Sequence, residues 1–125
     1  MQILLVEDNK AITKALTYTL MQNKYSILCT ESVAGTLKML EQEKIDLIIL
    51  DITLPDGNGF DLYKTIKKKY GISTIFLTAK DEESDVVKGL ELGAEDYVTK
   101  PFSTRELIAR INKVLLRNKK HNIIK

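Results

Sequence analysis

The chain has 125 residues, of which 44% are hydrophobic and 29% charged, with a formal net charge of +2. This balance predicts one soluble, cytoplasmic domain and excludes low-complexity or largely disordered chains, and no stretch approaches the ~20 apolar residues of a membrane span. The single cysteine, Cys29, excludes an internal disulfide, and we expect it to be a small core residue.

The first half of the chain alternates strand and helix patterns. Residues 3–6 form an apolar run that predicts a buried strand, and because no basic region or cleavage site accompanies it, we do not interpret it as a signal peptide. Helical spacing follows over residues 12–20. A weaker strand is predicted at 26–30, a helix at 33–40 with Ser32 as its N-cap, and a third strand at 47–50.

The second half repeats the alternation. A helix around residues 62–66 ends in three lysines and Gly71, which is a typical helix stop. Strands are predicted at 74–77 and 97–99, on either side of a helix over residues 86–92 that Gly93 closes. The last helix opens with the capping-box pattern of Ser103 and Glu106 and continues to Leu115, and residues 118–125 are expected to begin a linker.

Five strands alternating with five helices predict a parallel sheet with helices on both faces. From Pro101 onward the chain carries seven Lys/Arg against one acid, Glu106. We interpret this basic end as a solvated helix face rather than a nucleic-acid site, because no aromatic residue beyond Phe102 is interleaved with it.

Polar side chains follow four of the predicted strands, at the point where each strand ends. They are Glu7, Asp8, Asp51, Thr78 and Lys100. Because parallel strands end at the same edge of a sheet, we expect these side chains to converge. Crowded carboxylates repel one another, and oxygen ligands favour a hard divalent cation such as Mg²⁺.

Each residue also has a simpler interpretation. Glu7 and Asp8 suit the N-terminus of the next helix, Asp51 suits an Asx turn, Thr78 suits a backbone-bonded hydroxyl, and Lys100 suits an exposed surface. All five at matching strand ends is much less expected by chance. An Asp beside Mg²⁺, facing a lysine and a hydroxyl, can accept a phosphoryl group as a nucleophile.

Four segments of the sequence carry a family resemblance: "ILLVEDN", "DLIILDITLPDGNGFDL", "IFLTAK" and "LGAEDYVTKPF". In this order and spacing they resemble the receiver domain of bacterial two-component response regulators, over residues 1–117. The resemblance implies a flavodoxin-like (CheY-like) fold with strand order 2-1-3-4-5. It also implies a regulatory domain rather than a conventional enzyme, one that assists its own phosphotransfer and dephosphorylation.

The resemblance further implies roles for individual residues. Asp51 would be the phosphoacceptor, supplied by a sensor histidine kinase. Glu7, Asp8, Asp51 and the backbone carbonyl of Thr53 would hold Mg²⁺. Thr78 and Lys100 would bind the phosphoryl oxygens, Tyr97 would be the switching aromatic, and Lys100-Pro101 would be a cis peptide.

The segment "LGAEDYVTKPFSTRELIARI" is similar to the OmpR/PhoB subfamily. Its members add a winged-helix DNA-binding domain, so DNA would be bound only by a domain absent from this chain. The resemblance implies a phosphorylation-dependent homodimer, whose interface residues here would be Leu90, Asp96, Ile108 and Arg110. Val86 stands where the subfamily often has a basic partner for the glutamate that matches Glu106. Thr53 and Lys80 also depart from the usual Met and Arg, at positions that can tune dephosphorylation.

Three other functions share parts of this residue pattern. A phosphatase of the haloacid dehalogenase type needs a second Asp two residues after the first, where this chain has Thr53. A flavin carrier needs a phosphate-binding loop where "EDNKA" offers acids. A stand-alone receiver that acts by protein contact remains the alternative, and the length of the native gene would discriminate it from a transcription factor.

Overall fold

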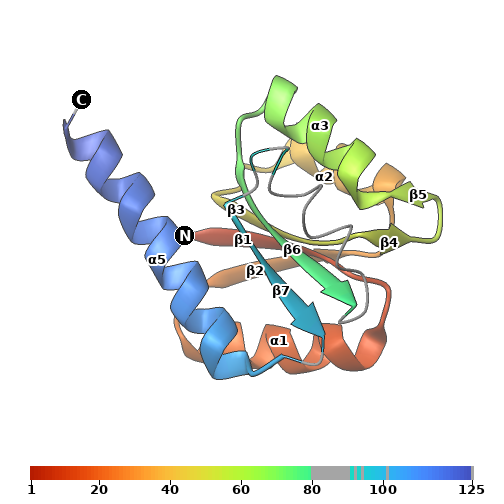
Figure 1. Ribbon diagram of the computed structural model, residues 1–125, viewed down its shortest axis with the longest axis horizontal. Helices are drawn as coiled ribbons and strands as arrows, with labels where there is room; N and C mark the ends of the chain where they lie inside the picture. The colour runs from red at the N-terminus through yellow and green to blue at the C-terminus, as the bar shows by residue number, and fades with distance from the viewer. Residues whose placement is uncertain (80–90, 92, 94, 101, 125) are drawn as a thin grey trace.

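A computed structural model describes residues 1–79, 91, 93, 95–100 and 102–124. Five parallel strands form one sheet in the order β2-β1-β3-β6-β7 (Figure 1). Their bounds are Gln2–Val6 (β1), Ser26–Thr30 (β2), Leu47–Asp51 (β3), Ser73–Ala79 (β6) and Asp96–Lys100 (β7). The predicted order 2-1-3-4-5 is confirmed, because β6 and β7 are the fourth and fifth strands of this sheet.

The four described helices cover both faces of the sheet, as the alternating pattern predicts. Figure 1 shows α1 and α5 on one face and α2 and α3 on the other. The helices are Lys10–Gln22 (α1), Val33–Gln42 (α2), Gly59–Lys69 (α3) and Thr104–Ile124 (α5). The helix predicted over residues 86–92 falls mostly outside the described residues.

Alternate side chains of the central strands build two separate hydrophobic clusters. Ile3 and Leu5 of β1 pack with Leu16 of α1 and Leu107 of α5. Leu4 and Val6, which point to the opposite face, pack with α2 and α3. All five residues of β3 are buried, as expected for a central strand covered on both sides.

A short antiparallel ribbon, which the sequence patterns did not predict, follows β3 directly. It consists of Thr53–Leu54 (β4) and Gly57–Asn58 (β5), with Thr53 opposite Asn58. Asn58 then caps α3 by accepting a hydrogen bond from the Phe60 N–H at 2.7 Å. The chain therefore leaves the core strand, turns back once and enters α3 within eight residues.

Two local predictions differ from the structure. Cys29 is exposed rather than in the core, because β2 is an edge strand; its sulfur lies 3.5 Å from the Thr17 hydroxyl. The last helix continues to Ile124, well past the predicted Leu115, so the segment expected to begin a linker is helical. Among the described residues, no helix has the length and apolar character needed to cross a membrane.

Candidate functional site

The polar residues predicted to converge lie at one edge of the sheet. Val6 pairs with Leu50, which brings the next residues along the two strands, Glu7 and Asp51, side by side. β7, which lies next to β6 on the other side of β3 from β1, ends at Lys100. The convergence inferred from parallel strand ends is therefore present for the acids and for the lysine.

The Asp51 carboxylate is held from two directions. Its Oδ1 accepts a hydrogen bond from the Thr53 N–H at 3.2 Å, and its Oδ2 accepts one from Lys100 Nζ at 3.1 Å. The side chain is nearly buried, with 7% of the residue exposed. The contact with the Thr53 N–H is the arrangement of an Asx turn, and it fixes the carboxylate that faces the lysine.

Glu7 is the more deeply buried acid of the pair. Its Oε2 accepts a hydrogen bond from the Asn9 N–H at 3.1 Å, and its Oε1 lies 2.8 Å from Lys100 Nζ. Oε1 nonetheless receives no well-directed hydrogen bond. Burial, followed by the adjacent Asp51 carboxyl, raises the pKa of Glu7 to about 7, although Lys100 and the Asn9 N–H act in the opposite direction.

Lys100 lies between the two carboxylates. Burial alone would lower the pKa of its ammonium group. The contact with Glu7 and the charges of Asp51 and Glu7 outweigh that effect and raise the pKa above its ordinary value. Lys100 therefore stays charged at neutral pH, at the point where an anionic group would meet Asp51.

The three acids fit a divalent metal ion. Glu7, Asp8 and Asp51 each offer one carboxylate oxygen, and these oxygens all lie within 4.8 Å of one another. The buried Glu7 Oε1 without a well-directed hydrogen bond is an atom that a cation would satisfy. An all-oxygen donor set with few protein ligands favours Mg²⁺, whose remaining ligands are usually water.

Asn9 was missed by the sequence reasoning, although it explains why the acids are available. Its Oδ1 accepts hydrogen bonds from the Ala11 and Ile12 N–H groups at 3.0 and 3.2 Å, which makes it the N-cap of α1. Because Asn9 caps the helix, Asp8 is not needed there. An Asn directly before a helical pattern is a recognised N-cap signal and could have identified it.

Gly59 is the second residue that the sequence reasoning missed. A Cβ atom at this position would lie 2.5 Å from the backbone oxygen of Asp51 and 2.8 Å from Ile52 Cα. Its N–H donates a 2.7 Å hydrogen bond to the Ile52 carbonyl. The first residue of α3 thus packs directly against the end of β3, where only glycine fits.

For some of the predicted site and interface residues, only part lies within the described structure. Thr78 pairs in register with Thr99 in the sheet, but its side chain, Leu90 and Pro101 with the expected cis peptide lie outside the described residues. Tyr97 is half-buried and packs against the cluster under α2 and α3. Ile108 was expected on a surface patch; it is only 9% exposed and packs into the core, so it offers little area to a partner.

Asp96 and Arg110, which were expected to form an ion pair between two subunits, lie in contact within one chain. Arg110 Nη1 lies 2.6 Å from Asp96 Oδ2, and Nη2 lies 3.0 Å from Glu106 Oε1. Glu106 is thus paired with Arg110, four residues along the same helix. Its backbone N–H also completes half of the predicted capping box, with the Ser103 hydroxyl at 3.3 Å.

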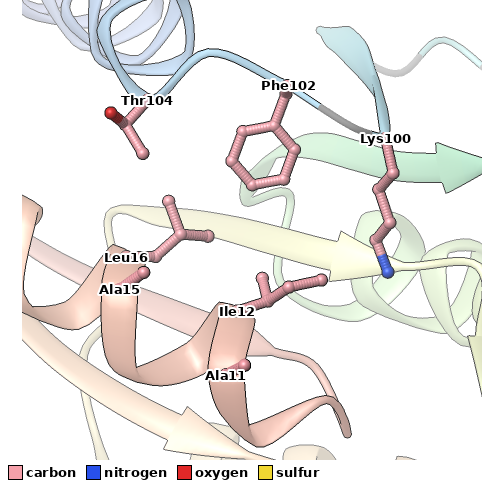
Figure 2. Close-up of a pocket in the computed structure, with 7 residues that line it drawn as sticks. All are labelled: Ala11, Ile12, Ala15, Leu16, Lys100, Phe102 and Thr104. Carbon is pink, nitrogen blue, oxygen red and sulfur yellow. The ribbon is translucent and has the colours of Figure 1, made fainter.

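An apolar pocket of about 500 Å³ adjoins the acidic site. Figure 2 shows Ala11, Ile12, Ala15 and Leu16 of α1 on one side of it and Phe102 opposite, with the Lys100 ammonium at its edge. The pocket separates the start of α1 from the segment between β7 and α5. A molecule that approaches Lys100 from this side meets mainly hydrocarbon.

The sequence and the structure are both similar to receiver domains of response regulators. The sequence profile of the response regulator receiver domain matches residues 3–112. The receiver domain of the TMAO respiratory system response regulator TorR is 37% identical, with a TM-score of 0.89 and coverage of 93% of this chain and 97% of that one. The non-phosphorylated HemR receiver domain from Leptospira biflexa is 36% identical, with a TM-score of 0.84 and coverage of 91% and 93%.

A longer protein also matches. DrrB from Thermotoga maritima, described as an OmpR/PhoB homologue, is 33% identical, with a TM-score of 0.84. The match covers 94% of this chain but only 53% of DrrB, so it accounts for about half of that protein.

Proposed function

Since this chain belongs to the response regulator receiver domains, the phosphoacceptor switches of two-component signalling, we propose that Asp51 is the residue that accepts the phosphoryl group. The observation that carries this assignment is the position of its carboxylate, which ends the central strand and is held by Thr53 and Lys100. Receiver domains take this group from kinases, and we assign the donor as a phosphohistidine of a sensor kinase.

The proposed transfer uses the groups that surround Asp51. An oxygen of Asp51 attacks phosphorus, and the bond between phosphorus and the donor nitrogen breaks with its electron pair going to the imidazole, which takes up a proton. Lys100 offers its positive charge to the phosphoryl oxygens as they arrive. Mg²⁺, when bound by Glu7, Asp8, Asp51 and the Thr53 carbonyl, supplies further neutralisation of negative charge.

The charge balance at the site supports a switch. In the described structure Lys100 pairs with Asp51 and Glu7. A phosphoryl group on Asp51 would compete for that ammonium and for the hydroxyl of Thr78, which draws the ends of β6 and β7 toward Asp51. Tyr97, which follows Asp96 in β7, would then turn inward and change the surface beside it.

We further propose that the signal controls transcription through an OmpR/PhoB-type partner domain and a dimer of receivers. The partial coverage of DrrB supports this proposal, because a receiver there occupies about half of a longer chain. The 125-residue chain alone should show no footprint at a defined DNA site, because the described helices are all used in the receiver fold. The length of the native gene would discriminate a transcription factor of this kind from a stand-alone receiver.

Intact-mass spectrometry tests the phosphoacceptor assignment. The protein should gain one phosphoryl group on treatment with acetyl phosphate and Mg²⁺, and Asp51→Asn should gain none. Asp61→Asn removes an exposed acid of α3 and should behave like the unchanged protein. Equal phosphorylation of Asp51→Asn would contradict the assignment.

A further inference from the structure

The ribbon that follows Asp51 is tied to α2 by one carboxylate. Asp56 Oδ1 accepts a hydrogen bond from the Val33 N–H at 2.7 Å, and Oδ2 accepts one from the Ala34 N–H at 3.1 Å. Ser32 caps the same helix end by accepting from the Gly35 N–H at 3.0 Å. Three N–H groups that a helix start leaves without intrahelical partners are thus satisfied, two of them by a residue 22 or 23 positions away.

The carboxylate suits this position electrostatically. The partial positive charge at the start of a helix attracts an anion. The hydrogen bonds from Val33 and Ala34 lower the pKa of the Asp56 carboxyl, so the side chain is ionised at neutral pH. Packing reinforces the contact, since a Cβ atom on Gly57 would lie only 3.0 Å from Val33 Cγ2.

The same ribbon reaches Asp51 at its other end. Asp56 lies in the two-residue turn between β4 and β5, and Leu54 pairs with Gly57 across it. Thr53, the first residue of β4, donates its N–H to Asp51 Oδ1. One continuous set of contacts therefore runs from the start of α2, through the Asp56 carboxylate and the ribbon, to the oxygen of Asp51.

We propose that Asp56 is a positioning residue for phosphoryl acceptance, which anchors the β4–β5 ribbon on α2 and thereby holds the Thr53 N–H on Asp51. This inference rests on the assignment of Asp51 as the phosphoacceptor. Asp56 itself touches neither Asp51 nor an incoming phosphoryl group. Its effect passes through the backbone of Thr53, whose N–H contacts Asp51 and whose carbonyl we also place among the Mg²⁺ ligands.

Four variants separate positioning from simple helix capping. Asp56→Ala removes both hydrogen bonds, and Asp56→Asn keeps an acceptor for one of them. Ser32→Ala weakens the cap of α2 from the side that does not touch the ribbon. Asp61→Asn removes an exposed acid from nearby α3 and controls for net charge.

Two measurements are made on each variant. The first is the amide proton shift and hydrogen-exchange rate of Thr53 by NMR in metal-free protein, which needs no phosphorylation. The second is the rate of phosphoryl gain from acetyl phosphate at saturating Mg²⁺, followed by intact mass, with the melting temperature recorded alongside.

We expect Asp56→Ala to speed exchange of the Thr53 amide and to slow phosphorylation by about fivefold, because small misplacements of a reacting group are costly. Asp56→Asn should lie between Asp56→Ala and the unchanged protein, and it carries the test if Asp56→Ala does not fold. Ser32→Ala and Asp61→Asn should change neither the Thr53 amide nor the rate.

Two results would overturn the proposal. One is Asp56→Ala lowering the melting temperature as Ser32→Ala does, with the Thr53 amide and the rate unchanged, which would make Asp56 a helix cap only. The other is a shifted Thr53 amide with an unchanged rate. If Asp51→Asn accepted phosphate as well, the phosphoacceptor assignment would fail, while the Thr53 amide would still report whether Asp56 holds the ribbon.

Discussion

Glu7 is an acid that the folded protein keeps partly protonated near neutral pH. Its pKa of about 7 exceeds the ordinary value of 4.5, so between these two values the folded chain binds a proton that the unfolded chain has lost. Glu7 therefore contributes stability that is full below pH 4.5 and is lost as the pH rises to about 7. In metal-free protein, the free energy of unfolding should fall by on the order of 1–2 kcal/mol between pH 5 and pH 8.

Urea unfolding at several pH values in the presence of a chelator measures this slope. Glu7→Gln removes the titrating group and should flatten the slope, with its largest gain in stability at pH 8. A Glu7→Gln variant that keeps the full pH dependence would assign the effect to other groups.

Asp8 differs from Glu7 because its side chain is exposed and Asn9, not Asp8, caps α1. Asp8→Ala should abolish Mg²⁺ binding and phosphorylation, yet leave the metal-free melting temperature unchanged or slightly higher, because repulsion with the neighbouring carboxylates is relieved. Calorimetric titration with Mg²⁺ and thermal unfolding check the two halves of this expectation. A large loss of metal-free stability would show that Asp8 supports the fold.

The site residues that lie at strand ends could be predicted from the sequence, because the strands that carry them could be predicted. Glu7 follows and Asp51 ends an apolar run, Lys100 ends the last predicted strand, and parallel pairing brings these strand ends together. Asp56 could not be found in this way, because its partners, Val33 and Ala34, are 23 and 22 residues distant and come into contact with it only once the ribbon folds onto α2. Cys29 was misplaced because an apolar run does not tell an edge strand from a central one.

At the scale of elements, the junction between β3 and α3 depends on the absence of a side chain at Gly59. Gly59→Ala would place a methyl group 2.5 Å from the Asp51 backbone oxygen, and the strand end or the helix must move. We expect a loss of about 1–3 kcal/mol in the free energy of unfolding, as for other overpacked positions, together with slower phosphorylation of Asp51.

Gly71→Ala provides the matched control for this junction. Gly71 has φ of +65° and open space around its Cβ position, so alanine there is strained without a clash. It should lower stability and leave the phosphorylation rate unchanged. Equal effects of the two substitutions on that rate would mean that Gly59 acts only through global stability.

Element prediction from the sequence succeeded where periodicity was long and failed where elements were short. The five main strands and four described helices lie where their apolar spacing placed them. The two-residue strands β4 and β5 are too short to show alternation, and "LPDGN" indicates only a turn. The end of α5 was misjudged because its last residues, "NKKHNII", lack the apolar spacing that marks Leu107 to Leu115.

For the whole molecule, the proposed dimer requires Arg110 to exchange partners. Within one chain Arg110 already contacts Asp96 and Glu106, so a contact to the partner replaces an existing ion pair rather than adding one. Exposed pairs contribute only about 0.2–1 kcal/mol each, and a two-fold interface contains each pair twice. We therefore expect Arg110→Ala to weaken the activated dimer only modestly, by up to about threefold, without changing Asp51 phosphorylation.

Sedimentation with and without beryllofluoride measures this effect. Arg105→Ala, which removes another exposed arginine from the same helix, serves as the control. An activated dimer that is indifferent to Arg110→Ala would place the interface elsewhere on the molecule.

The separation of the core into two clusters sets an order in which the chain can fold. Among the described residues, the buried members of the cluster under α2 and α3 all lie at or before Phe76, with only the half-buried Tyr97 added later, whereas the opposite cluster includes five residues of α5, from Leu107 to Leu115. During synthesis, the first cluster can therefore pack before the last helix is available to cover the apolar face of α1. Pulsed hydrogen exchange during refolding should show amides of α3 protected before those of α5, and the reverse order would contradict it. Until α5 forms, Leu16 and Leu20 of α1 lack the contacts of the last helix, and we expect the nascent chain to be most prone to aggregate during that interval.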